Sequence, residues 1–232
     1  MKGLNEPQDF RSSFPWRVFR IMSEFVDGWQ FLADFEKTVT IFGSARTPET
    51  DHWYQEARKL GNILGSNKYS VVTGGGPGIM EAGNRGCYEA GGTSIGIDIK
   101  LPFEQKSNPY ISKSQGFHYF FTRKVMLAYS AGAYVYFPGG YGTFDELFEM
   151  LTLIQTKKIT ENIPVILVGK DFWIPLMKWI EECVVQKYRT ASPEDIYLFK
   201  IVNTAEEAFE IIKQAPERRE FDEFITVHKA NT

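Results

Sequence analysis

The chain has 232 residues, of which 43% are hydrophobic, 24% are charged and 15% are aromatic. These proportions are ordinary for a globular protein, and they exclude a disordered chain, a fibre and a disulfide-stapled mini-protein. The length fits one large domain better than two small ones. Because the formal net charge is −3, no overall positive field attracts nucleic acid or an anionic membrane, and neither is expected as a partner.

Reactive and metal-binding side chains are sparse. Cys87 and Cys183 stand alone, without a C-x-x-C motif or a Cys/His cluster, which argues against a disulfide framework and a structural zinc site. The three histidines match no metal-ligand spacing, so we expect no metal centre. The N-terminus has no apolar leader segment, and no run of about 18 apolar residues follows it. A cytoplasmic location is therefore expected.

Short apolar strands alternate with amphipathic helices along most of the chain. Residues 14–36 carry apolar side chains at helical spacing and predict one or two helices before the first strand. The strands that follow are expected, in chain order, at 38–42, 70–73, 94–99, 117–121, 133–137, 164–168 and 198–202. Helices are expected between and after them at about 53–64, 79–90, 122–130, 144–157, 171–188 and 204–214.

This alternation predicts an α/β fold, a Rossmann-like doubly wound parallel sheet in three layers with an N-terminal helical extension. One nucleotide-binding domain is expected to span residues 1–232, with the extension at 1–37 and a charged peripheral tail at 215–232. Residues 101–116 are polar and indicate a long loop, and a loop of that length in a compact domain is often functional.

Two glycine-rich turns, Gly74–Gly78 and Gly139–Thr143, each follow a predicted strand and precede a predicted helix. Open parallel sheets bind their ligands at this edge. Glycine allows the backbone to approach an anion closely, and the free N–H groups and dipole of a helix N-terminus favour phosphate. Glycine also serves any tight turn, but two such loops on one sheet favour an anion site over plain turns.

Neither loop matches a standard nucleotide fingerprint. The dinucleotide pattern would need further glycines where the chain has Ile79 and Asp145, and the Walker pattern ending in Gly-Lys-Ser/Thr is absent. Dinucleotide redox chemistry and ATP hydrolysis are therefore disfavoured. A mononucleotide or a sugar phosphate is the expected ligand.

Acidic residues follow the second glycine loop. Thr143 and Glu146 have the spacing of a helix capping box, which by itself accounts for both residues. The same spacing places Glu146 beside the predicted phosphate loop, where a carboxylate can activate water or stabilise an oxocarbenium-like transition state. Asp145 and Glu149 are expected to point elsewhere, toward solvent or a partner.

Arg123 and Lys124 stand at the start of the helix before strand 133–137. A basic pair of this kind is usually a solvated surface feature. Cations at a helix N-terminus oppose the helix dipole, however, so an anionic ligand or a carboxylate is expected nearby.

Together these motifs resemble those of the Lonely Guy (LOG) family. Residues 71–82, VVTGGGPGIMEA, and 138–146, PGGYGTFDE, are similar to the paired GGG-x-G-x-M and PGG-x-GT-x-x-E motifs of that family. The resemblance extends to Gly43–Arg46 and Thr122–Lys124 and covers about residues 38–170. Members are cytokinin riboside 5′-monophosphate phosphoribohydrolases and related nucleoside-monophosphate nucleosidases, long mislabelled as lysine decarboxylases.

The resemblance implies that Arg123 and Glu146 form a catalytic pair. It implies a phosphate site at Gly139, Gly140, Tyr141, Gly142 and Thr143, and further substrate contacts by Ser44, Gly75, Gly76, Met80, Glu104, Lys124 and Thr152. The loop around Glu104, LPFEQKSNPY, departs from the plant-type sequence, which leaves the preferred base open. No metal ion or organic cofactor is implied.

By this resemblance the chain is an enzyme that hydrolyses the N-glycosidic bond of purine nucleoside 5′-monophosphates, AMP or N6-prenylated AMP, to the free base and ribose 5-phosphate. The alternative is a non-catalytic nucleotide or molybdenum-cofactor carrier that uses the same cleft, and a third is a structural protein with vestigial loops. Lysine decarboxylation would need a pyridoxal-phosphate Schiff-base lysine, and no lysine here has a recognisable setting of that kind. Family members are homodimers or larger, so a homo-oligomer is expected.

Overall fold

The computed structural model describes residues 14–100, 107–160 and 162–215. Residues 1–13 of the predicted extension, Glu104 and residues 216–232 of the predicted tail lie outside the described residues. In chain order the elements are α1 (Phe14–Ala33), β1 (Thr38–Phe42), α2 (His52–Ser66), β2 (Ser70–Thr73), α3 (Ile79–Glu89), β3 (Ser94–Ile99), β4 (Lys113–Phe117), α4 (Phe120–Ala128), β5 (Ala133–Tyr136), α5 (Tyr141–Gln155), β6 (Val165–Val168), α6 (Lys170–Trp179), the π-helix η2 (Ile180–Lys187), the 3-10 helix η3 (Pro193–Tyr197), β7 (Lys200–Val202) and α7 (Ala205–Ile212).

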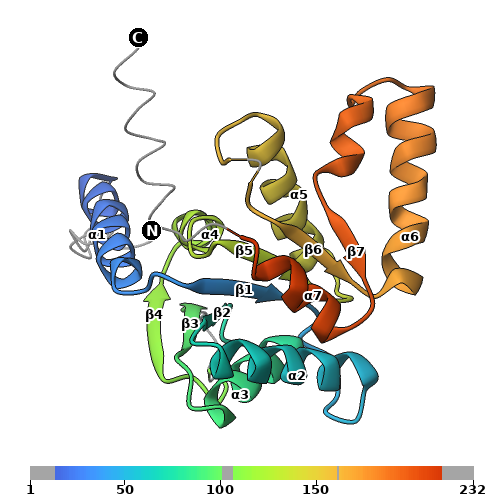
Figure 1. The fold of residues 1–232 in the computed structure, drawn as a ribbon. Coiled ribbons are helices and arrows are strands. Elements are labelled where there is room, and N and C mark those ends of the chain that lie inside the picture. The colour runs from blue at the N-terminus through green and yellow to red at the C-terminus, as the bar shows by residue number, and fades with distance from the viewer. Residues whose placement is uncertain (1–13, 101–106, 161, 216–232) are drawn as a thin grey trace, which may run out of the picture.

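The seven strands form one sheet in the order β4-β3-β2-β1-β5-β6-β7, and every neighbouring pair runs parallel. The chain adds strands outward from β1 to β4, then returns and adds β5, β6 and β7 on the other side of β1 (Figure 1). The strand order therefore reverses between β1 and β5, where Ile41 is in register with Val135. Open parallel sheets bind ligands at such a reversal. The predicted doubly wound, Rossmann-like fold is confirmed.

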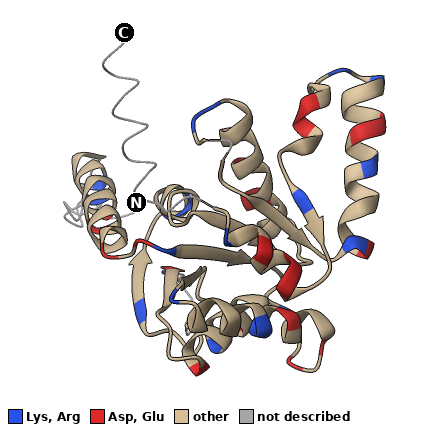
Figure 2. Ribbon diagram, in the orientation of Figure 1, with Lys and Arg blue, Asp and Glu red and all other residues tan. Residues whose placement is uncertain are grey.

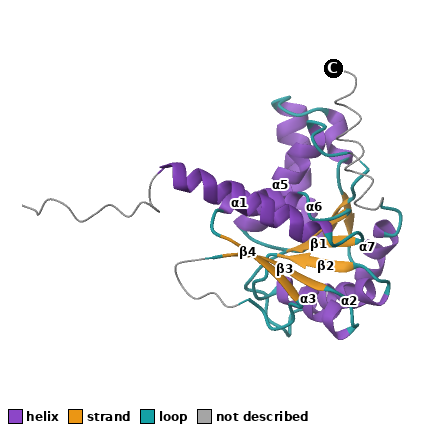
Figure 3. Cartoon of the chain, turned by 90° about the vertical axis from the view of Figure 1, so that its left-hand side faces the viewer, coloured by secondary structure: helices purple, strands orange, loops and turns teal. Residues whose placement is uncertain are grey.

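Helices cover both faces of the sheet, which gives the predicted three layers. Side chains of α2, α3 and α7 pack on one face together with Val39, Ile41 and Val135. Side chains of α1, α4, α5 and α6 pack on the other face together with Tyr134 and Tyr136. Figure 3 shows the strands between α1, α5 and α6 on one side and α2 and α3 on the other. Every residue of β5 is buried because alternate side chains enter the two cores.

The edge strand β4 occupies Lys113–Phe117, so the strand predicted at 117–121 was wrong. Lys113 and Ser114 are exposed, because β4 is the last strand on its side of the sheet. A polar edge strand lacks the apolar run by which buried strands are recognised. The aromatic residues Phe120 and Phe121, which suggested a strand, instead begin α4.

The other predicted elements are present, with ends that differ by a few residues, and the helix predicted at 171–188 is divided into α6 and η2. Lys and Arg are interspersed with Asp and Glu along the ribbon (Figure 2). Within the described part of the chain, no helix combines the length and the apolar character that crossing a membrane requires.

Candidate functional site

The carboxyl ends of β1, β2 and β5 bring three loops together at one edge of the sheet. Ser44, just after β1, links the other two loops through its backbone. Its N–H donates to the Pro138 carbonyl at 3.0 Å, and its carbonyl accepts from the Ile79 N–H at 3.0 Å. The two glycine-rich turns predicted to bind an anion are therefore neighbours.

The first glycine loop needs glycine for two separate reasons. Gly75 has φ +77°, and a Cβ there would overlap the Oδ1 atom of Asp98. A Cβ on Gly74 would overlap Nη2 of Arg123. The loop is thus shaped around an aspartate and an arginine that come from elsewhere in the chain.

A buried amide network supports this loop from below. The Asn108 side-chain amide donates to the carbonyls of Gly75 at 3.2 Å and Gly76 at 3.1 Å, and to Oδ1 of Asn84 at 2.9 Å. Asn84 in turn accepts from the Thr73 hydroxyl at 2.6 Å. Buried amides with several partners hold a loop in one conformation. Sequence reasoning missed both asparagines, because an isolated Asn has no motif and Asn108 is 32 to 33 residues from the loop it holds.

The second glycine loop leads directly into α5. Gly140 is the N-cap residue, α5 begins at Tyr141, and the N-cap residue makes no side-chain capping hydrogen bond. Thr143 therefore lies inside the first turn, and the predicted capping box of Thr143 and Glu146 was wrong. Glycine disfavours helix interiors, so Gly142 had suggested a later start. Helix capping consequently does not account for Glu146.

The N-terminus of α5 faces open space. Within the described part of the chain, nothing lies within 4 Å of a Cβ built on Gly140 or Gly142, and Tyr141 is 92% exposed. Gly139, in contrast, packs so closely on Thr143 that a Cβ would overlap the threonine hydroxyl. A helix N-terminus with free space before it suits an anion such as phosphate.

Arg123 lies between the carboxyl end of β3 and the first glycine loop. Its Nε donates to the Ile97 carbonyl at 2.8 Å, and its Nη2 donates to the Gly74 carbonyl at 3.2 Å. Burial lowers the pKa of Arg123, while the charges of Glu146 and Asp98 act in the opposite direction. The guanidinium stays charged and faces the loop edge of the sheet, so Arg123 is not a solvated surface residue.

Glu146 lies in the second turn of α5, and only 13% of its side chain is exposed. Burial raises the pKa of Glu146 to about 7, with Glu149 and Asp145 adding to the rise and Lys124 and Arg123 opposing it. A carboxyl group that titrates near neutral pH is suited to acid–base work.

Lys124 joins α4 to α5 through three carboxylates. Its Nζ lies 2.7 Å from Asp145, 3.0 Å from Glu149 and 3.8 Å from Glu146. Asp145 is exposed, as expected, but both Asp145 and Glu149 point toward Lys124, which the sequence did not predict. The sequence predicted an anionic ligand or a carboxylate near the basic pair, and three carboxylates lie there.

The Tyr136 side chain fixes the turn of α5 that carries Glu146. This buried tyrosine of β5 donates from its hydroxyl to the Glu146 backbone carbonyl at 3.2 Å. Its aromatic neighbours in the strand made Tyr136 look like a core residue only, so the sequence offered no signal for this contact.

Most predicted site residues meet at this edge of the sheet: Ser44, Gly75, Gly76, Met80, Arg123, Lys124, Gly139, Gly140, Tyr141, Gly142, Thr143 and Glu146. Met80 belongs here because its sulfur lies 3.1 Å from a Cβ built on Gly74. Thr152 is exposed on α5, about three turns from the start of the helix, and donates to the Phe148 carbonyl at 2.6 Å. Glu104 lies outside the described residues.

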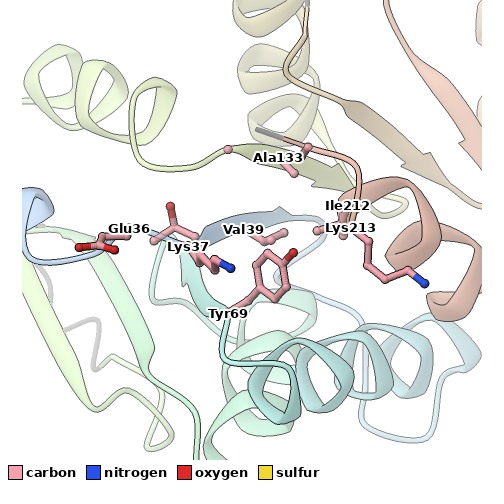
Figure 4. A pocket seen from close by; sticks show the side chains of 10 residues that line it. Glu36, Lys37, Val39, Tyr69, Ala133, Ile212 and Lys213 are labelled. Atoms are coloured by element: carbon pink, nitrogen blue, oxygen red, sulfur yellow. The ribbon is translucent and has the colours of Figure 1, made fainter. Parts of the chain in front are cut away.

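A pocket lies at the opposite edge of the sheet, beside the amino ends of β1 and β5 (Figure 4). Its lining includes Lys37, Tyr69, Ala133, Ile212 and Lys213. None of the predicted site residues that the structure describes lines this pocket. In the described part of the chain, no group of three or more His, Cys, Asp or Glu side chains is arranged to hold a metal ion.

The family comparison agrees with the motifs. The model of the family described as "Possible lysine decarboxylase" matches residues 80–212, more than half of the chain. The chain belongs to this family. The expected membership of the LOG group is confirmed by curated relatives that carry the name cytokinin riboside 5′-monophosphate phosphoribohydrolase.

Two LOG relatives illustrate the similarity. The Rhodococcoides fascians protein is 27% identical over 66% of this chain and 79% of the relative. The LOG protein of Oryza sativa subsp. japonica is 30% identical over 80% of this chain and 71% of the relative.

Solved structures share the fold of this chain. The structural-genomics target TM1055 is 27% identical, with a TM-score of 0.56, and the match covers 77% of this chain and 99% of that one. The molybdenum cofactor carrier protein of Chlamydomonas reinhardtii is 22% identical, with a TM-score of 0.58, and the match covers 77% of this chain and 97% of that one. At this identity the carrier protein is evidence of the common fold alone.

Proposed function

We propose that the chain hydrolyses the N-glycosidic bond of purine nucleoside 5′-monophosphates, AMP or N6-prenylated AMP, to the free base and ribose 5-phosphate. The observation that carries the proposal is the largely buried Glu146 carboxyl, whose pKa is raised to about 7, on the helix whose uncapped N-terminus faces open space. The names of the LOG relatives support the same reaction class.

In this proposal the 5′-phosphate binds at the N-terminus of α5, against the backbone of Gly139–Thr143. The N–H groups at the start of the helix and the helix dipole attract it, and the open space beside Gly140 and Gly142 admits it. The phosphate does not react, so its binding energy serves to hold the ribose in place for the chemistry.

Glu146 acts on the anomeric carbon in its ionised form. The bond between C1′ and the base nitrogen breaks, and its electron pair leaves with the base, which takes up a proton. The oxygen of a water molecule forms the new bond to C1′ and gives up a proton. A carboxylate beside C1′ stabilises the positive charge that develops there, or activates the water.

Arg123 orients the phosphate or the ribose hydroxyls and offsets negative charge. Two of its N–H groups are already used on Ile97 and Gly74, which fixes the guanidinium plane. Ser44, Gly75, Gly76 and Met80 complete the wall of the site around the sugar.

Lysine decarboxylation does not fit the lysine at this edge of the sheet. Burial lowers the pKa of Lys124, but the nearby carboxylates of Asp145, Glu149 and Glu146 together outweigh burial and leave the pKa raised. A lysine that forms a Schiff base needs a lowered pKa, so that the neutral amine can react.

We also infer that the chain forms a homodimer or a larger homo-oligomer. The exposed apolar side chains on α1, which include Phe14, Phe19, Met22 and Val26, support this inference together with the LOG resemblance. Light scattering on the purified chain should give a mass of at least two chains, and the mass of one chain would contradict the inference.

The reaction is tested by incubating the purified chain with AMP and separating the products by chromatography. Adenosine, GMP, CMP and UMP serve as parallel substrates. Adenine and ribose 5-phosphate from AMP, with no adenine from adenosine, is the expected result. Binding of nucleotides without release of any base would contradict the proposal and favour the carrier alternative, and absence of both would favour a structural protein.

A further inference from the structure

The carboxylate of Glu24, on α1, reaches the N-terminus of α4. Its Oε1 accepts from the His118 N–H at 2.7 Å, and its Oε2 accepts from the Tyr119 N–H at 3.3 Å. Oε2 also lies 2.6 Å from the Thr122 hydroxyl. These contacts join residues that are 94 to 98 positions apart in the sequence.

This carboxylate serves as the cap that α4 lacks locally. The N-cap residue Tyr119 makes no side-chain capping bond of its own, and Glu24 instead accepts from the N–H of Tyr119 and of the preceding residue His118. A negative charge at this position also interacts favourably with the helix dipole. Glu24 therefore supplies both the acceptor atoms and the charge.

Close packing of α1 on α4 brings Glu24 within reach. Gly28, one turn further along α1, is buried, and a Cβ there would lie 2.5 Å from the Met126 sulfur and 3.0 Å from the Phe117 ring. The missing side chain lets the two helices approach. Glu24 and Gly28 lie on the same face of α1 because residues four apart are neighbours on a helix.

The helix held in this way carries the basic pair of the site. Arg123 directly follows Thr122 and reaches the first glycine loop, and Lys124 pairs with the carboxylates of α5. A tilt or shift at the start of α4 would move both cations relative to Glu146.

We propose that Glu24 is a positioning residue for the reaction: by capping α4 from α1, it holds Arg123 and Lys124 in their working positions beside Glu146. The inference rests on the proposed nucleosidase function and adds to it a role for the N-terminal helix. Glu24 acts through α4 and touches neither the substrate nor the reacting atoms.

The test compares Glu24→Ala and Glu24→Gln with the control Asp27→Ala. Asp27 is exposed on the same helix, and among the described residues its carboxylate accepts from Ser23, so its replacement removes an equal charge without a change to the Glu24 contacts with α4. We expect Glu24→Ala to lower kcat for AMP by about ten- to a hundredfold, the scale of a small displacement of catalytic groups. Glu24→Gln, which keeps one acceptor oxygen, should recover part of the loss, and Asp27→Ala should match the unsubstituted chain.

The pH profile separates positioning from a general loss of stability. Lys124, Arg123, Glu149 and Asp145 are the charged groups that act on Glu146. If α4 moves in Glu24→Ala, Lys124 and Arg123 lie farther from Glu146 and lower its pKa less. The rise of kcat/KM with pH should then shift to higher pH. Partial unfolding would lower kcat/KM by the same factor at every pH and would leave the pH of the rise unchanged. Circular dichroism at the assay temperature identifies the folded variants, and Glu24→Gln carries the test if Glu24→Ala does not fold.

Base release by the unsubstituted chain, with kcat and pH profile unchanged in folded Glu24 variants, would overturn the role of Glu24 and leave the proposed function intact. No release by the unsubstituted chain would overturn the proposed function, and the positioning role with it.

Discussion

Lys124 lies 3.8 Å from Glu146, yet it lies closer to two other carboxylates, at 2.7 Å from Asp145 and 3.0 Å from Glu149. One ammonium group is thus shared among three acids, and Glu146 is the most distant of them. Because attraction between charges weakens with distance, Lys124 reduces the effect of burial on Glu146 without cancelling it. The pKa of Glu146 remains at about 7.

The first prediction concerns the pH dependence of the reaction. Since ionised Glu146 is the reactive form, kcat/KM for AMP should rise as the pH increases through about 7. Lys124→Met removes a cation that favours the ionised form, so the rise should move to higher pH and activity at neutral pH should fall severalfold. Lys178→Met, on the exposed surface of α6, serves as the control. An unshifted profile in Lys124→Met would show that Lys124 does not act on the catalytic ionisation.

The second prediction concerns stability. The folded pKa of Glu146, about 7, lies above its ordinary value of 4.5, so in this range the folded chain holds a proton that the unfolded chain has lost. The free energy of unfolding should therefore decrease as the pH rises from 4.5 through 7. Glu146→Gln removes the cost of a buried charge and should be more stable than the unsubstituted chain above this range, by up to about 3 kcal/mol.

The measurement is urea unfolding of both chains at pH 5 and pH 8. The stability difference should be small at pH 5 and should favour the glutamine variant at pH 8. A difference that is the same at both pH values would contradict the raised pKa of Glu146.

The third prediction tests the phosphate site at the N-terminus of α5. Gly142→Asp adds a negative charge where the helix dipole favours it, so thermal stability should be unchanged or slightly higher, by about 0.5 kcal/mol. The same charge should repel the substrate phosphate and raise KM for AMP at least about tenfold, because like charges within a few ångströms repel strongly. Gly142→Ala is the matched control, with a Cβ in open space and no charge. Equal AMP affinity in the two variants would rule out phosphate binding at this helix end.

The fourth prediction separates backbone strain from steric overlap in the first glycine loop. Gly75 and Gly91 both have positive φ, at +77° and +73°. A Cβ on Gly75 would overlap Asp98, whereas in the described part of the chain nothing lies within 4 Å of a Cβ built on Gly91. Gly91→Ala should cost only the backbone strain, about 1 kcal/mol, whereas Gly75→Ala should cost more, about 2–4 kcal/mol, and should weaken AMP binding. Thermal unfolding and binding titrations measure both effects. Equal losses of stability in the two variants would mean that the Asp98 side chain moves aside at little cost.

Elements buried on both faces of the sheet were predictable from the sequence. Strands such as β2 and β5 are almost entirely buried, and the glycine loops that follow these two strands mark the ligand-binding edge. The edge strand β4 was not predictable in the same way. Its exposed polar residues interrupt the apolar run by which a buried strand is recognised in a sequence. The start of α5 was predicted too late, because glycines at the N-terminus of a helix have the sequence pattern of a loop.

The predicted site residues came from local motifs, and the contacts that hold them came from distant parts of the chain. Arg123 and Glu146 stand in recognisable patterns, whereas Asn108 and Glu24 are single polar residues in otherwise unremarkable segments. Their importance depends on the tertiary contacts that bring Asn108 to the first glycine loop and Glu24 to α4. A single sequence carries no periodic or local signal for such contacts.

The most direct test of the account compares Glu146→Gln with the unsubstituted chain in two measurements, kcat for base release from AMP and the dissociation constant for AMP. The substitution keeps the size of the side chain and removes its charge. The account predicts a loss of kcat of about a hundredfold or more, the scale expected when a catalytic acid–base group is removed, with AMP affinity within a few-fold of the original value. A kcat close to that of the unsubstituted chain would contradict the central role of Glu146.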